Sequence, residues 1–303
     1  MNARVPVTSM RQPAGTNAVF RRARPWLGTL VEMQIEGLDA AAAARACERA
    51  FAEVAAVHAL MSFHEGAGDL ARLHGTPRGV TVRVDARTRE VLECVLRIAA
   101  ASAGAFDPTI AARLVESGML PRPLSPWTPD PSARWSDIEL PGARGVRLAR
   151  PLWIDLGGIA KGYAVDRAIE ILVDAGAAQA CVNAGGDLRV AGGRAERVNL
   201  RTHAGVEAWS GVEVADGAVA TSAGTGGNAP ARSRVHLDGR TRRPAGRRLV
   251  ATVVAARCIV ADALTKVVLA GPAASAARVL AQFGAQACVH DPRRGWSPLR
   301  VAA

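Results

Sequence analysis

The stretch from Leu152 to Gly193 carries the residue types best suited to holding a phosphorylated ligand. Gly157-Gly158 follow a short apolar run, and Lys161 comes three residues later. Apolar residues at helical spacing predict a helix from about Ile159 to Asp174. Unfilled backbone amides at a helix start, with a lysine in the first turn, suit an anion such as a pyrophosphate. An ordinary strand, helix and strand with glycines at tight corners explains the same spacing.

Two strands and two glycine turns are expected around this helix. The runs 152–156 and 180–184 are short and β-prone, and each leads into a glycine pair, 157–158 and 185–186. The two turns should therefore lie near each other. Two familiar phosphate motifs are excluded, because GGIAKGYA lacks the Gly-Lys-Ser/Thr ending of a P-loop and the GxGxxG spacing of dinucleotide-binding folds.

A second expected helix, over Val260–Ala270, carries three further polar residues. Asp262 is followed three and four residues later by Thr265 and Lys266. Residues at these spacings share one face of a helix, so the three side chains can point into one site.

Composition and charge limit the class of protein. The 303 residues are 49% hydrophobic, which indicates a globular chain, and no apolar run reaches the roughly 18 residues of a membrane span. The five cysteines are far apart and read as core residues rather than as a disulfide framework or zinc site. The net charge of +11 suits nucleic acid, a peripheral membrane contact or a diphosphate substrate. Because the arginine runs are scattered and no nucleic-acid motif occurs, nucleic acid is not expected.

The first 24 residues differ from the rest of the chain. They mix proline, glycine, threonine and arginine without periodicity, and we expect residues 1–24 to be a mobile basic tail before a single domain over residues 25–303. No apolar segment of the kind that signal peptides need precedes Pro25. The sequence as written therefore predicts a cytoplasmic protein, or a periplasmic or membrane-anchored one if the start is misassigned.

The fold class follows from the order of the predicted elements. Strands and helices alternate irregularly without an internal repeat, which predicts an α+β fold with mixed β-sheets flanked by helices. The glycine-rich stretch 224–230 is expected to be a mobile loop.

The central stretch also carries a family resemblance. DLGGIAKGYAVDRA followed by VNAGGDLR closely resembles the central motif of the ApbE-like flavin transferases, which cut FAD and attach its FMN half to a threonine of another protein. Further stretches occur in matching order: LGT at Leu27–Thr29, MSFHEGAGDLARLH at Met61–His74, FDPT at Phe106–Thr109, ATSAG at Ala220–Gly224 and ADAL at Ala261–Leu264. Together they cover nearly the whole chain after Arg24.

The resemblance implies which residues contact FAD. These are Leu27, His64, Ala105, Phe106, Asp107, Asp155, Lys161 and Ala245. His64 stands where the family has an aromatic residue that packs on the flavin; imidazole can stack, but it offers less surface than tyrosine. A plain surface-loop histidine and, for Asp107, a helix cap are the alternative roles.

The resemblance also implies a magnesium ion. The expected ligands are Asp262, Thr265 and the backbone carbonyl of Gly158. Lys266 stands where the family usually has threonine, and a charged ammonium cannot ligate a metal and is repelled by one. Three roles for Lys266 are open: it contacts the FAD phosphates, pairs with Asp262 in the metal's absence, or weakens metal use.

The implied reaction is transfer of FMN to a threonine of an acceptor flavoprotein, with release of AMP. His236 and Asp262 are the candidate proton acceptors, although His236 lies one residue closer to Asp238 than in the family's HxxDPxTG segment. Two alternatives remain: an FAD pyrophosphatase that gives FMN and AMP, and a non-catalytic FAD-binding protein.

Overall fold

The structure is a computed structural model that describes residues 19–202, 205–224, 236–246 and 248–299. Most of the predicted tail (residues 1–18) and of the predicted glycine-rich loop (225–230) lies outside the described residues. Within the described ranges, no helix combines the length and the apolar character that crossing a bilayer requires.

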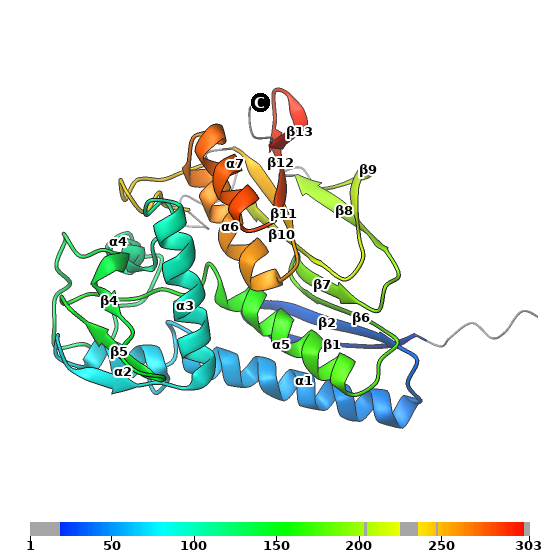
Figure 1. The fold of residues 1–303 in the computed structure, drawn as a ribbon, viewed down its shortest axis with the longest axis horizontal. Helices are drawn as coiled ribbons and strands as arrows, with labels where there is room; N and C mark the ends of the chain where they lie inside the picture. The colour runs from blue at the N-terminus through cyan, green and yellow to red at the C-terminus, as the bar shows by residue number, and fades with distance from the viewer. Residues whose placement is uncertain (1–18, 203–204, 225–235, 247, 300–303) are drawn as a thin grey trace, which may run out of the picture.

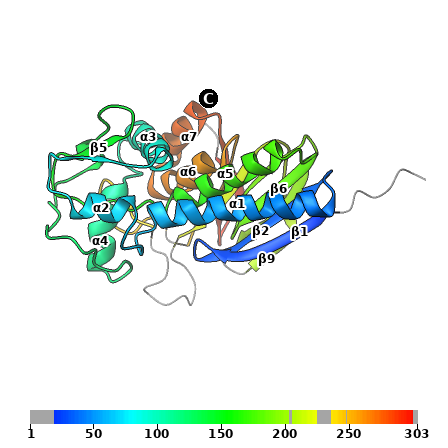
Figure 2. The ribbon, with the colours of Figure 1, turned by 90° about the horizontal axis from the view of Figure 1, so that it is seen from below.

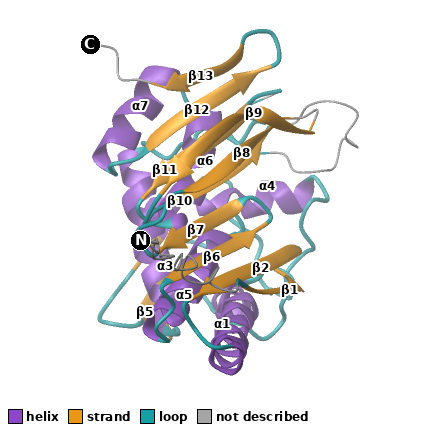
Figure 3. Cartoon of the chain, turned by 90° about the vertical axis from the view of Figure 1, so that its right-hand side faces the viewer, coloured by secondary structure: helices purple, strands orange, loops and turns teal. Residues whose placement is uncertain are grey.

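The fold is built on one large sheet of eight strands (Figures 1 and 3). In spatial order the strands are β1 (Phe20–Trp26), β2 (Thr29–Glu36), β6 (Gln179–Ala184), β7 (Asp187–Ala191), β10 (Ala218–Ala223), β11 (Val250–Ala255), β12 (Gln286–Asp291) and β13 (Gly295–Leu299). Each described neighbouring pair is antiparallel. The α+β class is thus confirmed, but the sheet is antiparallel rather than mixed.

Four helices cover one face of this sheet. They are α1 (Ala40–Met61), α5 (Ala160–Asp174), α6 (Cys258–Ala270) and α7 (Ala273–Gln282). Helix α5 packs on β6 and β7, α6 packs on β10 and β11, and α1 lies against α5. Figure 2 shows α1 starting on the β1–β2 side of the molecule and running towards the other side. The functional helices α5 and α6 are therefore held between the sheet and other helices.

A hairpin packs against the opposite face. Strands β8 (Glu196–Thr202) and β9 (Gly205–Val214) pair with each other in a separate sheet. Val214 of β9 belongs to a small buried cluster with Leu188 and Val190 of β7 and Val219 of β10. The neighbours of Val219, Ala218 and Ala220, belong to the main core, as strand alternation requires.

A smaller lobe lies beside the sheet, at the left of Figure 1. Its elements are α2 (Asp69–Gly75), β3 (Thr81–Arg83), α3 (Ala86–Ala101), the 3₁₀ turn η1 (Pro108–Ile110), α4 (Ala111–Glu116), the 3₁₀ turn η2 (Trp135–Asp137), β4 (Ile138–Glu139) and β5 (Gly145–Leu148). The three strands form a sheet in the order β3-β5-β4. Helix α3 contacts α6, which joins the lobe to the main core.

The predicted strand at 152–156 is not a strand. The segment is mostly buried, but it forms no strand ladder. Its amides find other partners: Ile154 N donates to His74 Nε2 at 2.9 Å, and Asp155 N donates to the carbonyl of Pro108 at 2.9 Å. A parallel pair joined by the central helix would need strands at both 152–156 and 180–184. Because 152–156 is not a strand, this pair does not form, and the predicted mixed sheet was wrong for that reason.

The predicted tail ends earlier than Arg24. Residues 20–24 belong to β1, which pairs with β2 from Phe20 opposite Ile35 to Trp26 opposite Thr29. The strand was missed because its interior residues are all exposed, so the sequence shows no apolar alternation.

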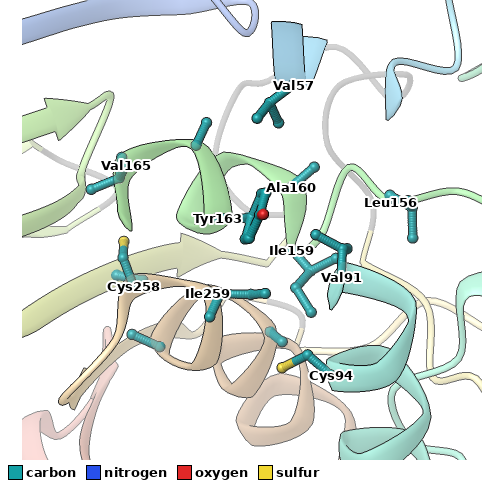
Figure 4. Packing of buried hydrophobic residues seen from close by; sticks show 14 of the residues in the cluster. Val57, Val91, Cys94, Leu156, Ile159, Ala160, Tyr163, Val165, Cys258 and Ile259 are labelled. Carbon is teal, nitrogen blue, oxygen red and sulfur yellow. The ribbon is translucent and has the colours of Figure 1, made fainter. Parts of the chain in front are cut away.

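The core between α5, α6 and α3 is tightly packed (Figure 4). Ile159, the N-cap residue of α5, and Tyr163 of α5 are almost fully buried, and Figure 4 shows them near Ile259 of α6 and Val91 of α3. The Tyr163 hydroxyl donates to Glu90 Oε2 at 2.9 Å. This packing fixes the start of α5, where Lys161 lies.

Candidate functional site

A cavity of about 530 Å³ lies where the two glycine turns meet the smaller lobe. Most of the predicted site residues line it: Leu27, His64, Ala105, Phe106, Asp107, Asp155, Gly158, Lys161 and His236, together with Lys266. Asp262, Thr265 and Ala245 are not among its lining residues. Its volume falls within the range of small-molecule sites.

The turn between β1 and β2 forms one wall of the cavity. Leu27 and Gly28 both have positive φ, 56° and 70°, as in the two-residue hairpin turns that match strand twist. The turn at Gly185 lies against this wall, because a β-carbon there would come within 2.3 Å of Thr29 Oγ1. The predicted proximity of the glycine turns 157–158 and 185–186 is confirmed, since Gly157, Gly158 and Gly185 line the same cavity.

The FDPT segment forms another part of the wall, through Phe106, Asp107 and Pro108. Asp107 Oδ1 accepts a hydrogen bond from Thr109 N at 2.8 Å, so its predicted capping role is confirmed, for the 3₁₀ turn η1. Arg242 adopts a φ of 58° and donates to Thr109 Oγ1 at 2.7 Å. The backbone of 236–245 packs closely on this segment, because a β-carbon at Gly239 would lie 2.5 Å from Asp107 Cβ.

Lys161 is the first charged group of the cavity. It lies in the first turn of α5, and its ammonium forms an ion pair with the buried carboxylate of Asp187, at the start of β7. Although burial disfavours its charge, Asp262 and Asp187 raise the pKa of Lys161 above its usual value. Burial and the charge of Asp262 raise the pKa of Asp187 in turn. The cavity therefore keeps a permanent cation beside the glycine turn.

Lys266 is the second charged group of the cavity. Its Nζ donates to Oδ1 of Asp262 and, at 3.0 Å, to the carbonyl of the same residue. The other carboxylate oxygen, Oδ2, accepts from the amide of Gly162 at 3.1 Å. Burial alone would raise the pKa of Asp262, but Lys161 and Lys266 together outweigh it and hold that pKa below its usual value.

These contacts test whether the predicted magnesium ligands fit an ion. Asp262 and Thr265 are fully buried, and the Thr265 hydroxyl lies 2.7 Å from the Asp262 carbonyl and 2.8 Å from Ser222 Oγ. Lys266 passes beside Gly158, where a β-carbon would lie 3.5 Å from its Cε. The ammonium thus takes a carboxylate oxygen of Asp262, the one charged group among the predicted ligands, and as arranged these residues do not fit a divalent cation.

No cluster of three or more histidine, cysteine or acidic side chains within the described ranges could hold a metal. The set expected from the sequence contains only one residue of these types, Asp262.

His236 and Asp155 are the other titratable groups on the cavity wall. Burial, and next the charge of Lys266, lower the pKa of His236 to about 3, so the imidazole is neutral at pH 7. Asp155 Oδ1 accepts from the amide of Gly157 at 2.9 Å, and burial raises the pKa of Asp155. Of the two predicted proton acceptors, His236 lines the cavity and Asp262 does not.

The chain belongs to the ApbE family, whose model matches residues 27–289. Three solved structures share its fold. Flavinyl transferase ApbE from Pseudomonas stutzeri, in its apo form, is 20% identical with a TM-score of 0.79, over 95% of this chain and 96% of that one. Flavin transferase ApbE from Vibrio cholerae is 19% identical with a TM-score of 0.74, over 93% and 97%. The ApbE protein from Thermotoga maritima is 23% identical with a TM-score of 0.77, over 93% and 97%. No curated protein matches the sequence.

Sequence reasoning missed the partners of the charged groups. Asp187 was considered only as part of the VNAGGDLR motif, yet it pairs with Lys161. Gly162 was given no role, yet its amide donates to Asp262. The available signal for Gly162 was its place one residue after Lys161, since a glycine inside a helix often marks close packing.

Proposed function

We propose that this chain is an FAD:protein FMN transferase, which moves FMN from FAD to a threonine of an acceptor flavoprotein. Membership of the ApbE family and the fold shared with structures named flavin transferases support this activity. The observation that carries it is the pairing, in one cavity, of apolar walls with two lysines. Apolar walls suit the isoalloxazine ring, and the lysines suit the diphosphate.

In the proposed reaction, the threonine oxygen attacks the phosphorus on the riboflavin side of FAD. A bond from this oxygen to phosphorus forms, the bond from phosphorus to the bridging oxygen breaks, and AMP leaves with that oxygen. Lys161 and Lys266 stabilise the negative charge that develops on the phosphoryl and leaving groups. The negative charges of the bound diphosphate oppose burial and Lys266 and raise the pKa of His236. The hydroxyl proton passes to the neutral imidazole of His236 and then to solvent, so one proton is released overall.

The experiment mixes the purified chain with FAD and a flavin-accepting domain that bears the target threonine. We expect flavin fluorescence on the acceptor band after denaturation, together with one AMP per flavin attached. The matched control is the acceptor with this threonine replaced by valine, which keeps the shape and removes the hydroxyl. AMP and free FMN without a labelled acceptor would instead indicate a pyrophosphatase, and bound FAD without AMP would indicate a binding protein.

A further inference from the structure

The lysine content of the chain is unusual. Of its 38 lysine and arginine residues only Lys161 and Lys266 are lysines, which leaves 36 arginines. Both lysines line the same cavity, and both pair with buried aspartates. Wherever else this chain uses a basic side chain, it uses arginine. The site therefore needs a property that the ammonium has and the guanidinium lacks.

That property is compactness. A guanidinium is a broad planar group, whereas an ammonium is a small point charge with three donors. Lys266 places this charge against the Asp262 carboxylate and the Asp262 carbonyl, while its methylene groups pass beside Gly158. Its side chain is only 13% exposed, and that of Asp262 is fully buried. The ammonium thus takes the position and the charge sign of a small bound cation.

The contacts of Asp262 show why a divalent ion would not share this position. One carboxylate oxygen accepts from Lys266, and the other accepts from the Gly162 amide at 3.1 Å. An added ion would have to displace a charged hydrogen bond and then lie beside a like charge.

Lys266 also faces the cavity. Its charge adds to burial in lowering the pKa of His236. The same charge opposes burial, which raises the pKa of Asp187. Lys266 therefore acts across the same space as Lys161. Among the described groups its Nζ donates to Asp262 alone, through two of three donors. The third donor remains for an oxygen of a ligand.

We propose that Lys266 is a built-in cation that replaces a divalent metal, so that this chain binds the FAD diphosphate and cleaves it without one. This inference rests on the proposed function, because it concerns the same substrate and the same step. The step is the displacement given above, with the ammonium of Lys266 in place of a metal charge beside the phosphates.

The test measures FAD affinity by the quenching of flavin fluorescence, in buffer with EDTA and in buffer with Mg²⁺. For the native chain we expect dissociation constants that agree within about twofold, because a charge-assisted hydrogen bond is already in place. With the acceptor domain present, AMP release should likewise persist in EDTA. A native chain that binds or cleaves FAD only with Mg²⁺ would overturn this inference and leave the proposed function standing. Absence of FAD binding in both buffers would overturn both.

The Lys266→Thr variant exchanges the ammonium for a hydroxyl that can ligate a metal. We expect FAD affinity to fall about tenfold or more in EDTA, the effect of losing a charged hydrogen bond, and to recover when Mg²⁺ is added. The matched control is Arg278→Thr, which removes one positive charge from an exposed position of α7 outside the cavity. Equal affinities of native and Lys266→Thr chains in EDTA would overturn the inference. Should this variant fail to fold, the native comparison still decides.

Discussion

Replacing Gly162 with alanine should force helices α5 and α6 apart. A β-carbon at this position would lie 2.3 Å from the carbonyl oxygen of Cys258 and 2.9 Å from Asp262 Cβ. Ordinary contact begins at 3.4 Å, so the two backbones must separate by about 1.1 Å. Neither neighbour is the flexible end of a side chain, and both helices are held by the sheet. We expect a loss of about 3 kcal/mol in the free energy of unfolding, the upper end for overpacked cores.

The measurement is urea denaturation followed by circular dichroism, with FAD affinity as a second readout. Affinity should fall as well, because the Gly162 amide donates to Asp262 at 3.1 Å and would move with its helix. Gly75→Ala is the matched control: it lies at the end of α2, and nothing lies within 4 Å of its added carbon. There alanine should be neutral or stabilise by up to about 1 kcal/mol. Equal unfolding midpoints for the two variants would refute the close-packing argument.

Three further predictions concern single side chains. Lys161→Met should weaken FAD binding about tenfold or more, because it removes a cation and leaves the buried Asp187 without its ion-pair partner. An unchanged fluorescence titration would contradict this prediction. Burial lowers the pKa of His74 to about 4, whereas an unfolded histidine titrates near 6.5. Between these pH values the unfolded chain binds more protons than the native chain, so the free energy of unfolding should fall by about 3 kcal/mol as the pH drops from 6.5 to 4. His74→Gln, which can still accept from Ile154 N, should remove that slope in pH-dependent denaturation. His236→Asn should slow transfer roughly 10²–10⁴-fold with little change in FAD affinity, and transfer at the native rate would exclude His236 as proton acceptor.

The helices were predictable from the sequence because their patterns are local. The central helix was expected from Ile159 and begins at Ala160, and Gly176 follows its end with a φ of 92°, as a C-terminal glycine does. The run at 152–156 was predicted as a strand from an equally local signal, its β-prone residues. Whether such a run finds a strand partner depends on distant segments, here His74 and Pro108, which local pattern does not encode.

The site was predictable in its residue types and less so in its pairings. The predicted helix put Asp262 and Lys266 on one face, because residues four apart are neighbours on a helix, and the structure pairs these two side chains. The pairing of Lys161 with Asp187 joins α5 to β7 across a turn, and only the packed structure brings them together. The sequence left three roles open for Lys266; the contacts in the structure favour its pairing with Asp262.

The two outer strands of the large sheet bear on how the molecule behaves in a crowded solution. An outer strand with unpaired backbone groups can recruit a strand from another chain and start a polymer. Here β1 carries arginines at three of its seven positions, and β13 contains Pro298, which has no amide to donate. At β1, repulsion between like charges opposes pairing with a strand of another molecule. At β13, the missing amide donor of Pro298 interrupts such pairing. Growth of the sheet from molecule to molecule is thereby disfavoured at both ends.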